Sequence, residues 1–486
     1  MGNAIPISGG ITPNFQVDVQ HFSIGSKWLY EEDSRFDAKN YSEGAFQVLD
    51  EIESCSFPKD LFGNLCGTIW HPVQNQARSN FKRIYTKPEH GVPFVSSRNM
   101  FFLPQRPEKF LSRRMSKLND LMVPENWILI SRSGTVGNAL FINKTLAKCA
   151  ITDHAIRIEP IKAPSGYLYA FLASRFGQAL IAKGTYGSTV DEIEPKHLAA
   201  IPVPLLPDAV QLSIHNKIIQ AYALRDEANE LFDKADTALY ELLGVSPFVE
   251  DDIEYLGKEN DPRGFSLSSL ELGERLDATH HVPTSRSAVH KLQRGCFDLV
   301  RLGEKVEQVY VAPRFARIYV KKEFGTPLLQ GSQLPSMRLY NLKYISNTKT
   351  EKIERWLIRR GWVLVTCSGT IGRVAVSSTM QDGWAASQHI LRIIPKTNTT
   401  HPGFLAAFLT TPFGQHQLKA KIYGGVVDEL TAKDTEVVFI PDAPYSEQKQ
   451  IGEAVVKVYE MRDEANALED EAIAELENFI SGSINK

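Results

Sequence analysis

Two short loops carry glycine, serine and threonine in a pattern that could contact a phosphate. The first, SGTVG, ends at Gly137, and the second, SGTIG, ends at Gly372; each follows an apolar run typical of a buried strand. Neither loop has a lysine after its last glycine, and the chain contains no Walker A motif. We therefore interpret the loop as a turn in which Gly134 and Gly137 adopt unusual backbone angles. Phosphate contact through its hydroxyls and amides is the alternative.

Histidines and paired carboxylates also occur twice and could do chemistry. His154 and His389 lie in TDHAIRI and SQHILRI, at the start of apolar strands, which favours structural histidines over catalytic ones. The pairs Asp191–Glu192 and Asp428–Glu429 could bind a metal, but a turn that leads towards a helix explains them better. The five cysteines are scattered without a CxxC pair, so we predict neither a zinc site nor a disulfide framework. We predict no metal site.

The composition excludes several classes of protein. The 486 residues are 43% hydrophobic and 23% charged, which is typical of globular chains with more than one domain. The start, MGNAIPISGG, is not typical of a signal peptide, and no apolar run approaches the roughly 20 residues that span a bilayer. We therefore expect a soluble cytoplasmic protein. The net charge of −3 argues against a uniformly basic nucleic-acid binder, although opposed patches can hide behind it.

Most of the sequence occurs twice in the same order, with an offset of 234 to 240 residues. The matching segments are RFDAKNY and RLDATHH, FKRIY and FARIY, GVPFV and GTPLL, the two SGTxG loops, DHAIRI and QHILRI, YLYAFLASRFGQ and FLAAFLTTPFGQ, YGSTVDEI and YGGVVDEL, and RDEANEL and RDEANAL. This period is too long for a solenoid. It indicates a tandem duplication of one module, which explains why the SGTxG loop is present twice. Each module is predicted to contain short strands and a helix, the first from Tyr167 to Lys183.

Each module is followed by one long helix with a heptad pattern, from about Asp208 to Leu243 and from about Ser446 to Ile480. The predicted seam residues are Ile214, Ile218, Arg225, Phe232 and Leu239 in the first helix and Ile451, Val455, Arg462 and Leu476 in the second. Matching helices favour an antiparallel coiled coil within the chain over helices packed only on their own modules. The two modules would then lie at opposite ends of the pair. Each seam arginine is expected to meet an acidic group across the interface, because an unpaired buried charge is costly.

Basic residues gather at matching places in both modules. Arg78 to Lys117 contains ten basic and two acidic residues, and Arg314 to Arg360 contains eleven and three. Basic modules and acidic helices favour phosphate contacts made by the modules, and the interspersed polar side chains could read base edges. The predicted DNA-binding residues are Arg78, Lys82, Arg83, Arg98, Asn99, Arg106, Arg113, Arg114 and Arg132 in the first module, and Arg314, Arg317, Lys321, Lys322, Gln333, Arg338, Arg359 and Arg360 in the second.

Three features of the sequence carry a resemblance to a known family: RFDAKNY with RLDATHH, the two SGTxG loops, and YGSTVDEIEPKHLAAIPVPLLP before a helix. On these features the chain resembles, nearly end to end, the specificity subunits of type I restriction–modification systems. The second copy carries Glu447–Gln448 at its helix start, whereas in the first copy Gln211 lacks the preceding glutamate. The resemblance implies an α+β fold with two target recognition domains, at 1–207 and 245–445. Spacer helices would occupy 208–244 and 446–486 and pair as an antiparallel coiled coil.

The resemblance also implies a function. Such subunits read an asymmetric two-part DNA sequence with an unread gap and hold two adenine methyltransferase subunits, which use S-adenosylmethionine and flip out the target base. A motor–nuclease subunit can join them. We expect this chain to have no catalytic residue and to bind no cofactor, because we find neither a Gly-rich AdoMet loop nor an Asn/Asp-Pro-Pro-aromatic motif. The alternative is a scaffold that bridges two protein partners without reading DNA; an enzyme of another type comes third.

Overall fold

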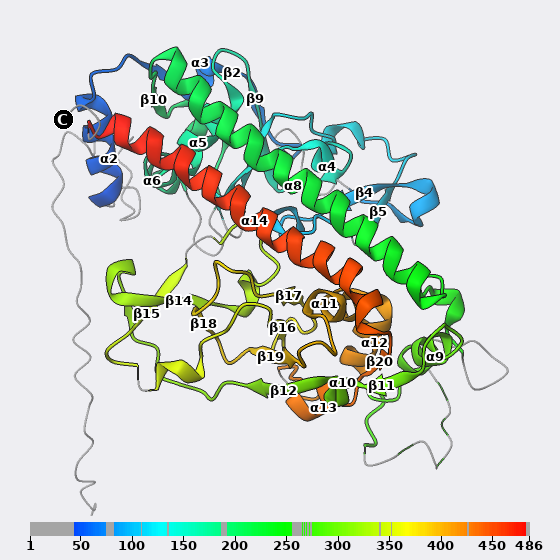
Figure 1. The fold of residues 1–486 in the computed structure, drawn as a ribbon. Coiled ribbons are helices and arrows are strands. Elements are labelled where there is room, and N and C mark those ends of the chain that lie inside the picture. Colours follow the sequence, from blue (N-terminus) through cyan, green and yellow to red (C-terminus); the bar gives the residue numbers. More distant parts are fainter. Residues whose placement is uncertain are drawn as a thin grey trace, which may run out of the picture.

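The computed structural model describes residues 43–73, 82–107, 109–133, 136–185, 192–254, 265, 267, 269, 272, 275–339, 342–350, 352–424 and 427–482. The RFDAKNY segment and Arg78, Gly134 and Asp191, which carried predictions above, lie outside these residues. Within them the chain forms two modules of like topology and two long helices (Figure 1).

The described part of the first module contains three sheets. The larger sheet is antiparallel and has the order β2 (Cys66–Trp70), β9 (Ala155–Pro160), β6 (Ile128–Ser131) and β7 (Ala139–Phe141). A smaller sheet has the order β3 (Tyr85–Thr86), β5 (Lys109–Ser112), β4 (Gly91–Val95) and β8 (Ala150–Ile151), and only β4 and β8 are parallel. Strands β1 (Lys59–Leu61) and β10 (Pro202–Pro204) pair as a ribbon.

The second module repeats this topology strand for strand. Its larger sheet has the order β12 (Val306–Val311), β19 (Ile390–Pro395), β16 (Val363–Thr366) and β17 (Val374–Val376). Its smaller sheet has the order β13 (Tyr319–Val320), β15 (Lys343–Ser346), β14 (Gly325–Leu329) and β18 (Ala385–Ala386), again with one parallel pair. Its ribbon is β11 (Leu299–Arg301) with β20 (Phe439–Pro441). The predicted duplication is therefore a duplication of a whole fold.

Helices of matching position pack on both modules. The longer ones are α2 (Glu43–Ser54), α5 (Ser165–Ala173) and α6 (Arg175–Lys183) in the first, and α9 (Pro283–Leu292), α11 (Pro402–Thr410) and α12 (Pro412–Ala420) in the second. Short helices are α3 (Phe62–Leu65), α4 (Lys144–Ala147), α7 (Pro195–Ala199), α10 (Leu302–Lys305) and α13 (Ala432–Glu436). The single helix predicted from Tyr167 to Lys183 was wrong, because the chain breaks at Ser174, whose buried hydroxyl caps α6 by accepting from the Gly177 amide.

A buried arginine ties the larger sheet of each module to the smaller one. Arg157 on β9 and Arg392 on β19 are fully buried and occupy the same place in DHAIRI and QHILRI. Arg157 donates to the carbonyls of Ile151 and Thr152, at 3.1 and 3.0 Å, at the end of the smaller sheet. Burial lowers the pKa of each guanidinium to about 10, so both stay charged at neutral pH. Carbonyl acceptors make such a cation tolerable in the interior.

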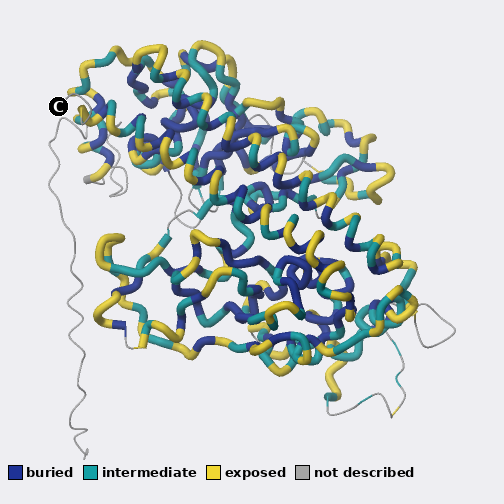
Figure 2. Tube along the Cα trace, viewed as in Figure 1, coloured by how far each residue is buried: buried dark blue, intermediate teal, exposed yellow. Residues whose placement is uncertain are grey.

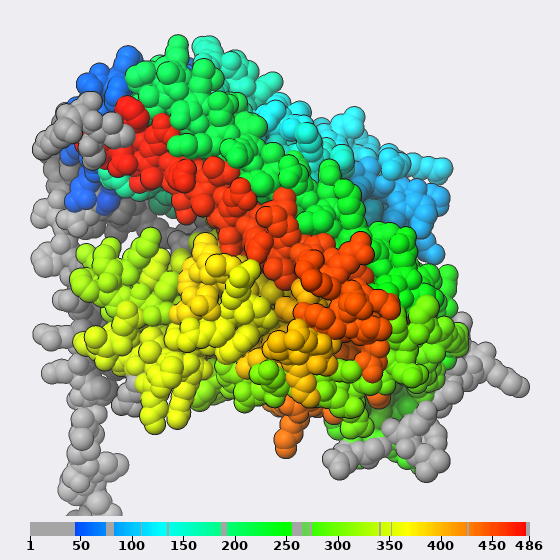
Figure 3. All heavy atoms as spheres, viewed as in Figure 1, coloured from blue at the N-terminus to red at the C-terminus, as the bar shows by residue number. Residues whose placement is uncertain are grey.

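The long helices α8 (Asp208–Leu243) and α14 (Tyr445–Ile480) begin and end within one residue of the predicted positions. Gly244 ends α8 with a φ of +66°, as its position after the last apolar residue predicts. The helices run in opposite directions side by side across the molecule (Figures 1 and 3). Lys217 pairs with Glu475 at 2.9 Å and Arg225 with Glu469 at 2.5 Å, so later residues of α8 meet earlier residues of α14. All nine predicted seam residues are buried.

The modules lie on the two sides of the helix pair (Figure 1), and their contacts with it fall at opposite ends, as predicted. The first module packs on the start of α8 and the end of α14, and the second packs on the start of α14 and the end of α8. Each helix contacts both modules, since Tyr240 near the end of α8 packs on Phe413 of the second module and Phe479 of α14 packs on Phe57 of the first. The buried residues form the interior of both modules and the helix faces turned towards them (Figure 2). Each long helix has an apolar surface that is too wide to be covered by the other helix alone. The modules cover the rest of that surface.

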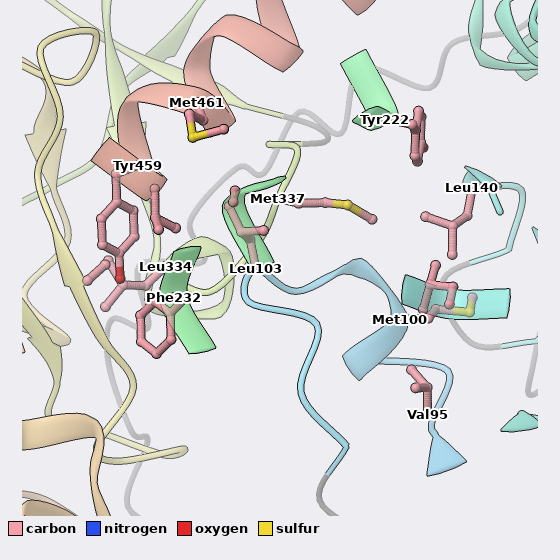
Figure 4. Close-up of a cluster of buried hydrophobic side chains, with 14 of the residues drawn as sticks. Val95, Met100, Leu103, Leu140, Tyr222, Phe232, Leu334, Met337, Tyr459 and Met461 are labelled. Carbon is pink, nitrogen blue, oxygen red and sulfur yellow. The ribbon is translucent and has the colours of Figure 1, made fainter. Parts of the chain in front are cut away.

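The modules also touch each other directly. The Leu103 amide donates to the Pro335 carbonyl at 2.9 Å, and the Met337 amide donates to the Phe101 carbonyl at 2.9 Å. Leu103, Leu334 and Met337 lie in one apolar cluster with Phe232 of α8 (Figure 4). The separation of the modules is therefore constrained by this strip as well as by the helices.

The two seam arginines do not have equivalent partners. Arg225 meets Glu469 across the interface as predicted, but Arg462 pairs at 2.9 Å with Asp463 of its own helix, so the prediction of an acid across the interface was wrong for Arg462. The reason lies in the aligned segments RDEANELF and RDEANALE, because Phe232 stands in the first helix where Glu469 stands in the second. The duplicated helices thus form an asymmetric pair.

Helix α14 is anchored to the second module by a close approach at Gly452. A Cβ added to Gly452 would lie 1.9 Å from His401 Nδ1, and one added to Gly403 of α11 would lie 2.1 Å from the Gly452 carbonyl oxygen. In the first module the histidine belongs to the spacer helix instead of the module: His215 of α8 accepts a hydrogen bond from the Gly166 amide at 3.0 Å.

We expect Gly452→Ala to lower the urea midpoint of unfolding. Overpacking costs about 1–3 kcal/mol, which outweighs the roughly 1 kcal/mol that alanine gains over glycine in a helix. Adding His401→Ala should recover part of the loss, because it removes the clashing ring. Glu464→Ala, at an exposed position of α14, is the control and should leave the midpoint nearly unchanged. Equal midpoints for Gly452→Ala and the control would contradict the close approach.

Candidate nucleic-acid interface

The SGTxG loops are turns held from behind by a glutamine. Gly137 has a φ of +91°, which confirms the predicted unusual angle there, and Gly369 and Gly372 of the second copy have φ values of +73° and +86°. Gln178 of α6 donates to the Gly137 carbonyl at 3.0 Å, and Gln415 of α12 donates to the Gly372 carbonyl at 2.8 Å. These glutamines are the last residues of the repeated FGQ, which explains why FGQ recurs with the loop.

Glu192 and Glu429, the second residues of the two acidic pairs, are structural partners of the same loops. Ser133 forms a β-bridge with Glu192, and Ser368 forms the equivalent bridge with Glu429. The Glu192 carboxylate accepts from Arg132 at 3.0 Å, while that of Glu429 accepts from the Tyr423 hydroxyl at 3.1 Å. Among the described residues no group of three or more His, Cys, Asp or Glu side chains could hold a metal ion. Glu192 and Glu429 thus both have partners within the protein.

The repeated histidines lie beside these loops. The half-exposed His154 is hydrogen-bonded through Nδ1 to the Ser133 hydroxyl at 3.1 Å. His389 Nε2 contacts Gln388 Nε2 at 3.0 Å, while Gln388 Oε1 accepts from Arg317 at 2.6 Å. Burial, and then the charges of Arg317 and Arg314, lower the pKa of His389, so its imidazole is neutral at pH 7. The sequence placed both histidines at strand starts but did not indicate that they line the SGTxG loops.

The predicted DNA-binding residues fall into two groups. The exposed group can approach a ligand from solvent and consists of Lys82, Arg98, Arg113, Arg114, Arg314, Lys321, Lys322, Arg359 and Arg360. The remaining described residues are partly or fully buried: Arg83, Asn99, Arg106, Arg132, Arg317, Gln333 and Arg338. Contact with DNA stays a prediction for all of these residues.

Several of these arginines bind carboxylates of the protein itself. Arg83 pairs with Asp153, Arg132 with Glu192 and Glu194, and Arg360 with Glu460 of α14. Arg106 and Arg338 are directed towards the spacer helices, where they pair with Asp233 at 2.8 Å and with Asp470 at 2.7 Å. RDEANELFD and RDEANALED place these two aspartates at equivalent positions. Arg106 and Arg338 therefore hold the modules against the helices, a role that the sequence did not indicate.

Two tandem α+β modules, each followed by a long helix and each presenting exposed cations, form the architecture of this chain. The family described as "Type I restriction modification DNA specificity domain" matches residues 79–227 and again residues 326–478. The chain therefore belongs to the type I restriction–modification DNA specificity family and contains two tandem specificity domains. This confirms the resemblance seen in the sequence. None of the helices in the described part of the chain is long and apolar enough to cross a membrane.

Three solved structures are similar over most of their length. The S subunit of a type I system from M. genitalium is 12% identical, with 87% of this chain and 96% of that chain covered and a TM-score of 0.36. The HsdS subunit from Thermoanaerobacter tengcongensis is 14% identical, with 88% and 97% covered and a TM-score of 0.26. A chain from a study of type I complex assembly and conformational transition is 13% identical, with 88% and 97% covered and a TM-score of 0.28. A comparison with curated proteins finds no match.

Proposed function

We propose that this chain reads an asymmetric, two-part DNA site, with one module for each half-site and an unread gap between them. The observation that supports this most is the duplicated module arranged about an antiparallel helix pair. Such an arrangement has an approximate two-fold axis, and duplex DNA has two-fold axes of its own, so two modules can contact two half-sites on one duplex. The modules differ in sequence, which favours different half-sites.

We further propose that the chain holds two adenine methyltransferase subunits and has no catalytic activity of its own. S-adenosylmethionine would be bound by those subunits, and a motor–nuclease subunit can join the complex. The chain would bind no cofactor. These assignments rest on its membership of the specificity family and on the absence from its sequence of the AdoMet and Asn/Asp-Pro-Pro-aromatic motifs.

Selection from a library of random duplexes tests the proposed function directly. The chain together with its methyltransferase partner should enrich two short sequences separated by a gap of constant length. The chain alone, incubated with DNA and labelled S-adenosylmethionine, should incorporate no more methyl groups than a boiled control. Complex formation with the partner but no enriched sequence would favour a protein scaffold, and methyl transfer by the chain alone would contradict a non-catalytic subunit.

Arg113 and Arg114 follow β5 and are exposed, which suits contact with the phosphate backbone. We expect Arg113→Ala/Arg114→Ala to weaken binding to all sequences alike and to lower the salt slope of binding by about two, because each lost phosphate contact releases about one counterion fewer. Arg359→Ala/Arg360→Ala should lower the slope less, since Arg360 already lies 3.3 Å from Glu460. The slope is measured from DNA binding between 50 and 200 mM salt, a range over which about six phosphate contacts change affinity by 10³ or more. An unchanged slope in the first variant would place Arg113 and Arg114 away from DNA.

A further inference from the structure

A polar pocket of about 240 Å³ lies where the first module meets the SGTxG loop of the second. Arg98 comes from the first module, while Arg317, Ser368, Thr370 and His389 come from the second. The Arg98 guanidinium donates to the Thr370 hydroxyl at 3.4 Å and so closes the pocket across the boundary between the modules. The residues that line it include hydroxyl, amide and guanidinium donors but no carboxylate.

The charge of the pocket is positive. Arg98 and Arg317 form no ion pair with a carboxylate in the described part of the chain; Arg317 donates to the neutral amide of Gln388 at 2.6 Å. With Gln388 Oε1 accepting from Arg317, its Nε2 must donate to His389 Nε2, which leaves the histidine proton on Nδ1. Two uncompensated guanidinium groups among hydroxyls are suited to an anion, and phosphate is one of the anions that match the paired donors of arginine.

The first module lacks this charge at the equivalent place. DHAIRI and QHILRI align Asp153 with Gln388, and FKRIY and FARIY align Arg83 with Arg317. Arg83 is paired with Asp153, so its charge is compensated within the protein. The duplication therefore provides an internal comparison, in which one residue decides whether the arginine is available to an external anion.

The loop that forms one wall of the pocket is preorganised. Gln415 donates to the Gly372 carbonyl, and the Gly369 amide donates to the Asp428 carbonyl at 3.1 Å. The Thr366 hydroxyl donates to the Thr370 carbonyl at 2.6 Å. A loop fixed by three bonds loses little conformational entropy when a ligand binds, which favours binding by a small anion.

We propose that this pocket binds a phosphate group, and that in the complex the group belongs to the DNA backbone between the two half-sites. The DNA part rests on the proposed function. Because Arg98 and the SGTxG loop belong to different modules, one phosphate would be held by both specificity domains. Phosphate contact, the less favoured interpretation of the loop from sequence, thus becomes the preferred role of its second copy, and the loop is at the same time the predicted turn.

Gln388→Asp tests the pocket by placing in the second module the residue that the first module has at this position. It gives Arg317 the carboxylate partner that Arg83 already has, so the folded module should tolerate it. Lys148→Gln, at an exposed position after α4, changes the net charge by the same amount and is the control. Arg98→Gln, at an exposed position, removes the guanidinium that the first module contributes to the pocket.

Two measurements on the full chain separate free phosphate from DNA. Inorganic phosphate, compared with chloride at equal ionic strength, should raise the melting temperature of the wild type and Lys148→Gln more than that of Gln388→Asp or Arg98→Gln. With the methyltransferase partner present, the last two variants should also show a salt slope of DNA binding lower by about one, with unchanged half-sites.

The outcomes distinguish this proposal from the proposed function. If the wild type enriches no DNA sequence, the proposed function fails. If it enriches a two-part site and Gln388→Asp retains both the phosphate response and the salt slope, only the pocket proposal is overturned. A phosphate response that Gln388→Asp lacks, with an unchanged salt slope, would assign the pocket to free phosphate and overturn the contact with DNA.

Discussion

Glu469→Gln is expected to destabilise the protein by about 3–5 kcal/mol, because it removes the only carboxylate bonded to the buried Arg225 among the described residues. Both side chains of this pair are fully buried. Glu469 also accepts from the Tyr169 hydroxyl at 2.6 Å and lies 3.1 Å from Arg338 Nη1. The group therefore joins α14 to α8, to the first module through Tyr169, and to the second module through Arg338. Replacing its charge leaves the Arg225 guanidinium in the interior without its counterion, whereas Arg338 keeps Asp470.

Glu471→Gln is the matched control, since this glutamate lies two residues further on the exposed side of the same helix. Urea unfolding should separate the two variants clearly, with the control within about 0.5 kcal/mol of the wild type. Similar unfolding of Glu469→Gln and Glu471→Gln would mean that the buried pair does not hold the helices together.

The stability that Glu469→Gln loses should depend on pH. Burial by itself would raise the pKa of the Glu469 carboxyl, but Arg338, Arg225 and the Tyr169 hydroxyl hold that pKa below its ordinary value. A carboxyl whose pKa is lowered by folding stabilises the protein above its unfolded pKa, about 4.3, and this contribution is lost as the pH falls through the folded pKa. The difference between wild type and Glu469→Gln should therefore be full at neutral pH and shrink below about pH 4.

Lengthening both spacer helices by one turn is expected to lengthen the unread gap by one or two base pairs while both half-sites stay the same. Four added residues extend a helix by about 6 Å, and B-DNA advances about 3.4 Å per base pair. Extra residues after Ala235 of α8 need a matching insertion in α14, because the register set by Arg225 with Glu469 would otherwise be lost. In that antiparallel register the matching place is after Val458. An insertion close to one turn keeps the apolar seam nearly in phase.

The direct contact between the modules opposes this change. The insertion would separate Leu103 from Pro335 and Arg338 from Asp470, so the variant should be less stable than the wild type. Because each helix contacts both modules, we expect the helices rather than this short strip to set the spacing.

Modified sites mapped across a genome, with the methyltransferase partner present, measure the gap. The same four residues placed after Lys162, in the exposed loop between β9 and α5, are the control and should leave the gap unchanged. An unchanged gap in the lengthened variant would show that the direct contact sets the spacing.

The sequence alone was sufficient for the features that depend on local pattern. The order of matching segments predicted the duplication, and the heptads with the glycine at position 244 predicted the spacer helices to within one residue. The predicted glycine angle holds at Gly137 and is repeated at Gly372 of the second copy. These features follow from side-chain periodicity and from the backbone freedom of glycine, which neighbouring residues decide. The assignment to the specificity family also followed from such local motifs.

Only the tertiary structure decided which distant residues meet. Arg225 and Arg462 look alike in sequence, yet among the described residues only Arg225 finds an acid across the interface, because Phe232 stands on α8 where Glu469 stands on α14. Nothing local to Arg106 or Arg338 shows that each faces a spacer aspartate, or that Arg98 lies beside a loop of the other module. An ion pair depends on where two separate segments come together in space, and a single sequence carries no signal for that position. The placement of the modules beside the helix pair, in contact with each other, was decided in the same way by long-range packing.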